Sequence, residues 1–296
     1  MPRSPASAEP NGSRRTSLGG HLLIPSEVAK KRPSTKKNVV AQARAGTSGP
    51  PTASPLRGRV WENVKSLAGA VLIYLVIKTL FVEAFRIPSG SMVPTLLVAD
   101  WLFVNKLVYG PHIPFTDVLL PGYADPRRGE VVVFKSPHQP DLAANGEDPT
   151  PTLVKRLMGM PGDTLYMREG LLYVNGVAQR QGYGAAANPR GDPNETSPLM
   201  EWQRRIELAG TRFGRPPAAP TLDHWGPLLI PQEHYFMMGD NRHASKDSRF
   251  WGVVARDNVR GRPMFIYYSF VPAGESDRPV SFITDIRWSR IGKTIR

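Results

Sequence analysis

The most prominent hydrophobic feature of the chain is one long apolar run behind a polar N-terminal part. Residues 67–82, LAGAVLIYLVIKTLFV, are apolar at all but three positions. As a helix they would rise roughly 24 Å against a hydrocarbon core of about 30 Å, so flanking residues such as Trp61 and Phe85 must complete a membrane span. The pattern predicts one transmembrane helix with flanks over residues 59–85. A buried core helix is an alternative, whereas a secretory signal would begin near residue 1.

Beyond this run, hydrophobic residues come in short blocks that are typical of β-strands. Apolar, β-branched or aromatic blocks are separated by Gly, Pro, Asn and Asp turns, and no long helical period competes with them. Residues 86–296 are therefore predicted to form a mainly β, antiparallel domain. The blocks lie at residues 131–134, 153–158, 171–174, 235–238 and 265–268.

One part of this domain has a different texture. From about residue 179 to 227 the chain is rich in Gly, Pro, Arg and Ala, with one candidate helix at residues 198–209. Long irregular segments between strands are usually surface insertions. We interpret residues 179–227 as an inserted subdomain.

The positive charge of the chain is concentrated in its first residues. The 38 Lys and Arg against 25 Asp and Glu give +13, of which residues 1–65 carry 12 basic and 3 acidic residues, a net +9. Residues 1–58 cannot bury enough apolar area to offset chain entropy, so we predict a disordered basic tail. Arg57, Arg59 and Lys65 flank the apolar run, and the positive-inside rule then predicts a cytoplasmic tail and an extracytoplasmic β domain.

Cysteine and histidine usage restricts the chemistry. The chain has no cysteine, which excludes disulfides, cysteine nucleophiles and thiolate metal sites. Its six histidines show neither HExxH spacing nor a close pair, so we expect no metal site and no cofactor.

The stretch IPSGSMVPTL at residues 87–96 directly follows the apolar run. Pro88 favours an extended residue before it, Gly90 permits unusual dihedrals and Pro94 blocks a helix, so Ser91 is expected on a stiff, non-helical turn. Such a turn can hold a hydroxyl and a backbone N–H in place. By local composition alone, the plainer interpretation is a loop that leaves the membrane.

A serine nucleophile needs a base within hydrogen-bond reach. In the predicted strand LVKRLM, alternation places Lys155 on one face with Leu153 and Leu157, and Arg156 on the other. Apolar neighbours desolvate an ammonium group and lower its pKa, which must fall roughly 3 units from about 10.4 for a base near neutrality. A snorkelling lysine at a sheet edge is the alternative, so burial of Lys155 decides between them.

The third polar constellation is the loop GDNRHASKDSRFWG at residues 239–252. Its density of hydrogen-bonding groups indicates a built loop, although a solvated turn with a surface pair of Asp247 and Arg249 is the alternative. His243 lies near the acidic residues of this loop, so a Ser-His-Asp arrangement must be weighed. Its neighbour Arg242 favours an exposed loop histidine instead.

Together these segments resemble one family, the bacterial type I signal peptidases, which are the leader peptidases of the cytoplasmic membrane. The resemblance covers roughly residues 67–269, and the tail and the insertion lie outside it. It rests on SGSMVPTL (89–96), RGEVVVFKSP (128–137) with VKRLMGMPGD (154–163), and GDNRHASKDSR (239–249).

The resemblance implies a role for each matching residue. Ser91 would be the nucleophile and Lys155 the general base of a Ser-Lys dyad. Ser89 and the amide of Ser91 would form the oxyanion hole. Ser245 would orient the lysine.

The loop at residues 239–249 both matches and departs from the family. Asp247 and Arg249 match a supporting ion pair. His243 and Ala244 stand where the family commonly has Asp-Asn, so no role is carried over to these two side chains.

The resemblance and the location imply a substrate. A site about 6 residues beyond Phe85 would work at the membrane surface, where a signal peptide ends in small residues at −1 and −3. Small residues imply shallow apolar pockets, whose candidate walls are Phe85, Ile87, Met92 and Val154. We expect a membrane-bound serine endopeptidase that removes signal peptides from exported preproteins. It would contact lipids of the bacterial cytoplasmic membrane and no nucleic acid.

Two alternatives remain at this point. One is a membrane-anchored binding or scaffold protein whose basic tail grips anionic lipid or nucleic acid. The other keeps proteolysis but assigns the base to His243.

Overall fold

The computed structural model describes residues 56–113, 116, 118–179, 196–210, 212–275, 278 and 280–296. Nearly all of the predicted tail, up to residue 55, lies outside the described residues, as do residues 180–195 of the predicted insertion. Residues 54–296 belong to one compact unit.

The apolar run forms a helix that ends at the edge of a sheet. Helix α1 (Leu56–Val76) continues into one π-helical segment, η1 (Ile77–Phe81), and strand β1 (Val82–Arg86) begins at the next residue. Val60–Phe81 is the one described helix that is long and apolar enough to cross a membrane, and its most apolar window is entirely unburied. The helical stretch therefore ends four residues before the end of the predicted helix and flanks at 85, because residues 82–85 pair with a neighbouring strand instead.

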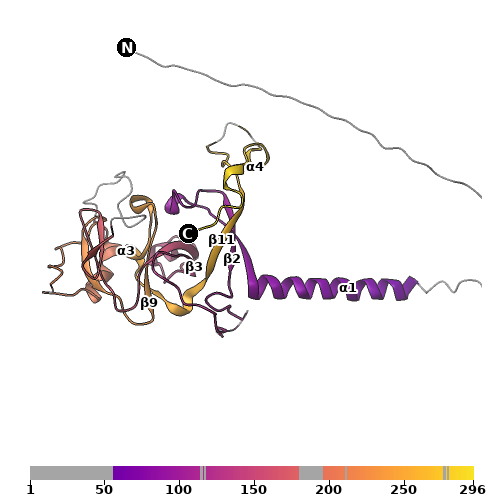
Figure 1. Cartoon of the computed structure of the whole chain (residues 1–296), viewed down its shortest axis with the longest axis horizontal. Coiled ribbons are helices and arrows are strands. Elements are labelled where there is room, and N and C mark those ends of the chain that lie inside the picture. Colours follow the sequence, from indigo (N-terminus) through magenta and orange to yellow (C-terminus); the bar gives the residue numbers. More distant parts are fainter. Residues whose placement is uncertain are drawn as a thin grey trace, which may run out of the picture. The chain divides into compact units, whose positions relative to one another are not determined.

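The larger sheet holds the segments that resemble the family. Its seven strands have the order β1-β2-β11-β3-β4-β9-β10, and every pair is antiparallel. Figure 1 shows β2, β11 and β3 side by side. The six strands besides β1 are β2 (Asp100–Asn105), β3 (Val131–Lys135), β4 (Thr152–Gly159), β9 (His234–Met238), β10 (Val254–Ala255) and β11 (Val259–Ser269).

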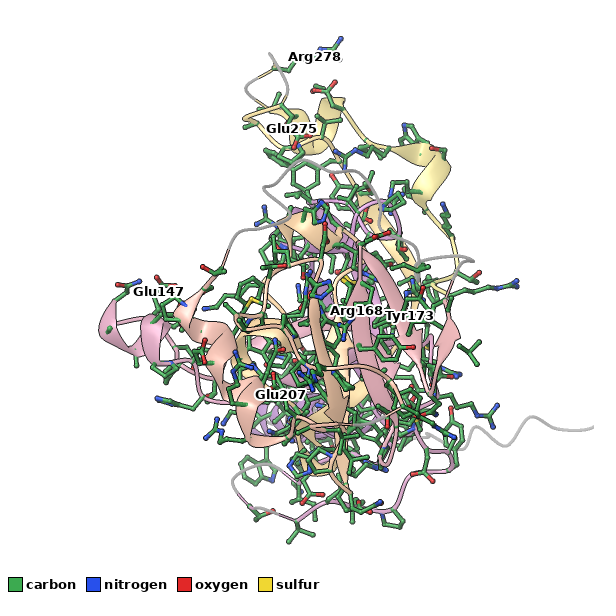
Figure 2. The ribbon with its side chains drawn as sticks, turned by 90° about the vertical axis from the view of Figure 1, so that its left-hand side faces the viewer. Glu147, Arg168, Tyr173, Glu207, Glu275 and Arg278 are labelled. Atoms are coloured by element: carbon green, nitrogen blue, oxygen red, sulfur yellow. The ribbon has the colours of Figure 1, made fainter. Side chains whose placement is uncertain are left out.

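A smaller antiparallel sheet has the order β7-β6-β5-β8. Figure 2 labels Arg168 on β5 and Tyr173 on β6. Buried Leu165, Trp225 and Phe236 join this sheet to β9 of the larger one in one hydrophobic cluster. The strands are β5 (Thr164–Arg168), β6 (Leu171–Val174), β7 (Val177–Ala178) and β8 (Trp225–Leu229).

Only short helices connect these strands in the described part of the chain. The α-helices are α2 (Pro140–Ala144), α3 (Ser248–Trp251) and α4 (Ser281–Thr284). The 3-10 helices are η2 (Gly90–Met92), η4 (Pro198–Arg205), η5 (Arg242–Ala244), η6 (Arg256–Asn258) and η7 (Trp288–Arg290).

The β-rich fold class is confirmed, with differences at the ends of its parts. All five predicted blocks lie in strands, namely β3, β4, β6, β9 and β11. The candidate helix at residues 198–209 is a shorter 3-10 helix, η4, and the predicted insertion runs too far, since β8 begins at Trp225. Two of the missed strands, β1 and β5, mix apolar and polar residues without a continuous hydrophobic block, as VEAFR and TLYMR show. The blocks also left out β2, β7, β8 and β10.

Candidate active site

The IPSGSMVPTL stretch forms the connection between β1 and β2. Backbone bonds close its base: the Ile87 N–H donates to Asp100 O at 2.8 Å, and the Ala99 N–H donates to Ile87 O at 2.9 Å. Ser91 lies in the short 3-10 turn η2, and the next side chain, Met92, is only 1% exposed. Burial of a methionine contributes about 1.5–3 kcal/mol, so Met92 anchors the turn that presents Ser91.

Lys155 lies at the centre of β4, between two neighbouring strands. β3 pairs with it on one side, where Val132 is its register partner, and β9 flanks β4 on the other. Lys155 is only 4% exposed, and its Nζ donates a hydrogen bond to Ser91 Oγ at 2.5 Å. A buried lysine on a central strand excludes the snorkelling alternative.

Burial changes the acid–base behaviour of this lysine. The pKa of Lys155 is lowered to about 8, chiefly by desolvation; the carboxylates of Asp247 and Asp240 raise it, and Arg249 contributes to lowering it. At pH 7 roughly a tenth of such a group is neutral. The Lys155 amine can therefore accept a proton under physiological conditions.

Ser89 lies next to the nucleophile candidate at the start of the same turn. Its Oγ is 3.5 Å from Ser91 Oγ, and its side chain faces solvent. It precedes η2 in extended conformation. A hydroxyl and the amide of Ser91 thus lie on the same turn as the Ser91 Oγ.

The loop after β9 donates hydrogen bonds to backbone oxygens of the serine turn. The Asn241 N–H donates to Ser91 O at 3.1 Å, and Asn241 Nδ2 donates to Gly90 O at 3.2 Å. At Gly239 an added Cβ would lie 2.2 Å from Ser245 Oγ and 2.5 Å from Ser91 O. Both the turn and Ser245 therefore pack against the bare backbone of Gly239.

Asp247 and Arg249 form a fully buried ion pair in this loop. Arg249 donates to the carboxylate through Nε and Nη2, each at 2.9 Å, and the Gly239 N–H adds a bond of 3.0 Å. Burial alone would raise the pKa of Asp247, but the charge and hydrogen bonds of Arg249 outweigh it and hold the pKa below its ordinary value. The sequence-based alternative of a solvated surface pair is wrong.

Ser245 lies in the loop after β9, and the described residues offer no hydrogen-bond partner to its side chain. Its side chain is 6% exposed, and no partner for its Oγ is found in the described part of the chain. Its Oγ makes no hydrogen bond to Lys155 here, although it lies against Gly239 close to the serine turn. An orienting role for Ser245 stays a prediction.

Sequence reasoning missed a second buried ion pair, which includes the strand neighbour of Lys155. Arg156 donates to Asp240 through Nε at 2.7 Å and through Nη2 at 2.8 Å, and Thr95 Oγ1 donates to the same carboxylate at 2.5 Å. Strand alternation correctly placed Arg156 opposite Lys155 but named no partner for it. The sequence contained a signal for this pair, because an arginine inside a buried strand requires a carboxylate as partner. Asp240 lies at the start of the polar loop and could have been named as that partner.

His243 takes no part in the contact to Ser91. Its Nε2 lies 2.8 Å from Asp223 Oδ1, and its side chain is only 4% exposed. The expectation of an exposed loop histidine is wrong, because Asp223 supplies a carboxylate that pairs with the buried ring. The hydrogen bond to Ser91 Oγ comes from Lys155.

A small pocket opens beside the two functional groups. It has a volume of about 50 Å³, and Ser91 and Lys155 both line it. Each of the four predicted wall residues is also among its lining: Phe85, Ile87, Met92 and Val154. Within the described residues, no group of three His, Cys, Asp or Glu side chains could hold a metal ion. The chemistry at hand is therefore that of a hydroxyl and an amine next to a small apolar pocket.

Comparison with known proteins gives one consistent family. The model of the family "Signal peptidase, peptidase S26" matches residues 60–268. The signal peptidase I of Pseudomonas aeruginosa is 33% identical over 78% of this chain and 78% of its own. That of Pseudomonas fluorescens is 36% identical over 71% of this chain and 72% of its own.

A solved structure also matches. A crystal structure of a signal peptidase I from Enterococcus faecalis V583 is 28% identical and covers 47% of this chain and 96% of that chain, with a TM-score of 0.28. The family model spans more than half of the chain, and both Pseudomonas relatives exceed 30% identity. The chain therefore belongs to the signal peptidase family, peptidase S26.

Proposed function

We propose that Ser91 is the nucleophile and Lys155 the general base with which this chain removes signal peptides from exported preproteins. Signal peptide removal by a serine protease follows from the family and its relatives. The assignment of the two residues is carried by one observation, the 2.5 Å hydrogen bond between a buried Lys155 Nζ and Ser91 Oγ.

The geometry supports an acyl-enzyme mechanism. Neutral Lys155 takes the proton of the Ser91 hydroxyl while Ser91 Oγ attacks the scissile carbonyl carbon. The resulting ammonium returns that proton to the leaving amine as the C–N bond breaks, leaving an ester on Ser91. Lys155 then deprotonates a water molecule, which hydrolyses the ester and restores both groups.

Four neighbouring residues are assigned supporting roles in this proposal. Ser89 Oγ and the Ser91 N–H stabilise the oxyanion, an effect that is worth about 3–4 kcal/mol of barrier for one donor. Asp247 and Arg249 fix the loop that carries Gly239, and Ser245 orients the lysine. The buried charges near Lys155 also set its pKa.

The pocket supports a preference for small residues. A volume of about 50 Å³ leaves room for little more than a methyl or methylene group beside Ser91. A larger side chain would clash with Ile87, Met92 or Val154, which are all largely buried. We assign this pocket to the small residues at −1 and −3 of the cleavage site.

We place the apolar helix across the bacterial cytoplasmic membrane, with the basic tail of residues 1–58 in the cytoplasm. The β-rich domain of residues 86–296 then lies on the extracytoplasmic side, in contact with membrane lipid. The exposed apolar surface of Val60–Phe81 and the basic residues before it support this arrangement. Ser91 follows the helix by only ten residues, so the dyad works near the bilayer surface.

The experiment measures cleavage of a model preprotein with an Ala-x-Ala site by the purified full chain in detergent. Ser91→Ala and Lys155→Ala are each expected to lower kcat by at least about 10²–10⁴-fold, because each removes one half of the nucleophile–base pair. His243→Ala is the matched control and keeps activity. Circular dichroism verifies the fold of each variant. Cleavage by Lys155→Ala at the wild-type rate would exclude Lys155 as the base.

A further inference from the structure

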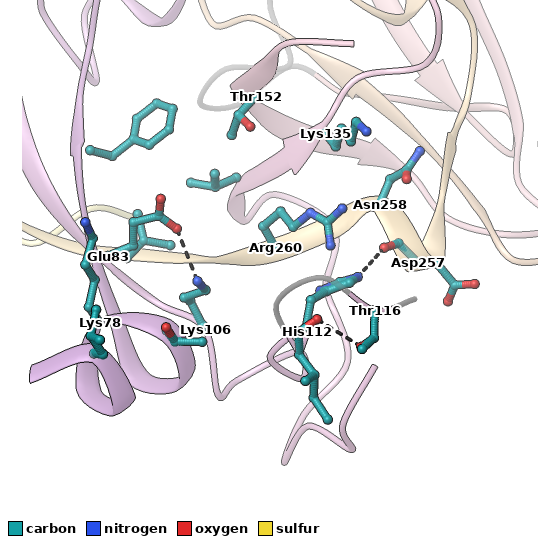
Figure 3. Close-up of a pocket in the computed structure, with 16 residues that line it drawn as sticks. Lys78, Glu83, Lys106, His112, Thr116, Lys135, Thr152, Asp257, Asn258 and Arg260 are labelled. Atoms are coloured by element: carbon teal, nitrogen blue, oxygen red, sulfur yellow. Dashed lines mark hydrogen bonds and ion pairs between the residues drawn. The ribbon is translucent and has the colours of Figure 1, made fainter. Parts of the chain in front are cut away.

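A second, larger pocket lies where the apolar helix meets the large sheet. Its volume is about 970 Å³, within the range of roughly 300–1,000 Å³ that is usual for ligand pockets. The end of the helix contributes Leu75 and Lys78, and β1, β2, β3 and β11 contribute further walls (Figure 3). Phe85 and Thr152 line both this pocket and the small one beside Ser91. The larger pocket thus reaches from the helix to the candidate active site.

The lining of this pocket carries an excess of positive charge. One of its acidic groups, Glu83, is already engaged by Lys106 at 3.4 Å. His112 adds no charge near neutrality, because burial and then the neighbouring Arg260 lower its pKa. In full, the basic side chains are Lys78, Lys106, Lys135 and Arg260, and the acidic ones are Glu83 and Asp257.

Arg260 is the group in this pocket that most needs a ligand. Its guanidinium lies near the centre of the pocket (Figure 3) and is partly buried. Among the residues that the structure describes, none accepts a hydrogen bond or forms an ion pair with it. Glu83 is an opposing charge for it, but partial burial outweighs that attraction and lowers the pKa of Arg260. A bound anion would offset this desolvation.

The walls of the pocket indicate where that anion comes from. Leu75 lines the pocket and is 49% exposed, and Phe81 of the same helix is 42% exposed. This apolar surface suits acyl chains, whereas a free anion or a carboxylate of an extended peptide would leave it uncovered. Lys78 can extend its ammonium from the helix toward the headgroups. The bilayer surface offers phosphate diesters at this depth.

We propose that this pocket binds the phosphate of an anionic phospholipid, with Arg260 as its bidentate ligand and Lys78 and Lys135 as further cations. A planar guanidinium matches two phosphate oxygens, and lysines add charge without a fixed geometry. The lipid's acyl chains lie along the exposed face of the helix. This inference rests on the membrane placement of Val60–Phe81 proposed above.

Such a lipid would hold the catalytic domain against the bilayer. Phe85 and Thr152 are shared by both pockets, so the domain would be docked right beside the Ser91–Lys155 pair. The cleavage site of a signal peptide emerges at the same surface. Binding of the headgroup therefore lowers the KM for membrane-inserted preprotein.

The test uses the full chain in vesicles of phosphatidylcholine alone or with phosphatidylglycerol, and measures KM for a membrane-inserted model preprotein. In the wild type, phosphatidylglycerol is expected to lower KM. In vesicles with phosphatidylglycerol, Arg260→Gln should raise KM about fivefold relative to the wild type, since one basic residue near an anionic surface is worth about 1 kcal/mol. Lys135→Gln changes an exposed side chain of the same pocket and provides a second variant that is less prone to misfolding.

The matched control is Arg205→Gln, which removes an exposed cation outside the pocket. It should respond to phosphatidylglycerol as the wild type does. If Arg260→Gln and Lys135→Gln also respond as the wild type does, the proposal is overturned. The proposal is also overturned if inorganic phosphate lowers KM in phosphatidylcholine vesicles, because the ligand is then a free anion. It is overturned as well if the effect of Arg260→Gln disappears when acidic residues after the cleavage site are replaced, because the ligand of Arg260 is then the substrate.

A second readout separates this inference from the assignment of the dyad. Native mass spectrometry counts the phosphatidylglycerol molecules retained by the wild type, by Arg260→Gln and by the inactive Ser91→Ala. Ser91→Ala should retain the lipid that Arg260→Gln loses. Equal retention by Arg260→Gln and the wild type would contradict the lipid site, whatever the cleavage assay shows.

Discussion

Lys155 is the residue on which the proposed chemistry depends, and its environment is unusual for a lysine. It is 4% exposed, donates to Ser91 Oγ at 2.5 Å, and has its pKa lowered to about 8 by burial. Burying an ammonium is unfavourable, so burial of Lys155 lowers both the pKa of its amine and the stability of the fold. Both consequences can be measured.

The first concerns the pH dependence of cleavage. In the proposed mechanism the neutral form of Lys155 is the reactive one, so kcat/KM for a model preprotein should rise about tenfold per pH unit below the pKa and level off above about pH 8. Initial rates in detergent between pH 5 and 10 provide the profile, and circular dichroism verifies folding at each pH. An inflection near about 6.5 would instead indicate a histidine base.

The second concerns stability. The pKa of Lys155 falls from 10.5 to about 8, a difference of about 2.5 units, which corresponds to about 3 kcal/mol of destabilisation. This cost is fully present below pH 8, where the lysine is charged in both the folded and the unfolded state. It is relieved as pH rises toward 10.5.

Lys155→Met should therefore be inactive but more stable than the wild type, by up to about 3 kcal/mol at pH 7. The difference should vanish above about pH 10.5, and urea unfolding at both pH values measures it. Lys135→Met, at an exposed position on β3, is the control and should change stability by less than about 0.5 kcal/mol. A destabilised Lys155→Met at pH 7 would contradict the inferred cost.

At the scale of elements, the site depends on contact between two loops. The turn between β1 and β2 carries Ser91, and the loop after β9 supports it through Asn241 and through close packing at Gly239. The loop itself is held by the buried pair of Asp247 and Arg249. The position of the nucleophile is therefore set by a loop that begins almost 150 residues later, at residue 239.

Gly239→Ala tests this contact. Its Cβ would lie 2.2 Å from Ser245 Oγ and 2.5 Å from Ser91 O, so the serine turn must move. A displacement of about 1 Å is expected to lower kcat/KM about 10²-fold, while the melting temperature falls much less. Gly274→Ala, whose Cβ meets nothing within 4 Å, is the control. Full activity of Gly239→Ala would show that the turn tolerates the shift.

At the scale of the whole molecule, the basic tail and the proposed active site lie in different parts of the sequence, and we expect them to function separately. Residues 1–65 carry a net charge of +9, whereas every residue assigned to the dyad and its support lies between Ser89 and Arg249. Because the tail is poor in apolar residues, we expect it to contribute nothing to the core of the β domain. Its charge suits the cytoplasmic face of the membrane.

Deletion of residues 2–56 should leave cleavage of a model preprotein in detergent unchanged, because the dyad and its pocket remain intact. In vesicles, the same deletion keeps Arg57, Arg59 and Lys65, the basic residues that flank the helix, so its orientation should not change. Protease protection of the β domain measures this orientation and should match that of the full chain. Loss of cleavage in detergent on deletion would favour the alternative in which a basic binding tail is the functional part.

The sequence alone determined the features that depend on neighbouring residues. An apolar run of helical length, β-strand blocks between turn residues, and a Pro- and Gly-stiffened turn at Ser91 follow from local sterics and hydrophobic periodicity. Strand alternation placed Lys155 and Arg156 on opposite faces of β4. These predictions needed no knowledge of which strands pair.

Only the tertiary structure decided which of these groups meet. The contact between Ser91 and Lys155 bridges 64 positions, and that between Arg156 and Asp240 bridges 84. Burial of Lys155 depends on pairing of β4 with β3 and β9, which long-range packing selects. The partner of His243 was hidden for the same reason, because Asp223 lies outside the motif. Burial and charge pairing are properties of the assembled sheet, and they convert a lysine in a strand into a base beside a serine.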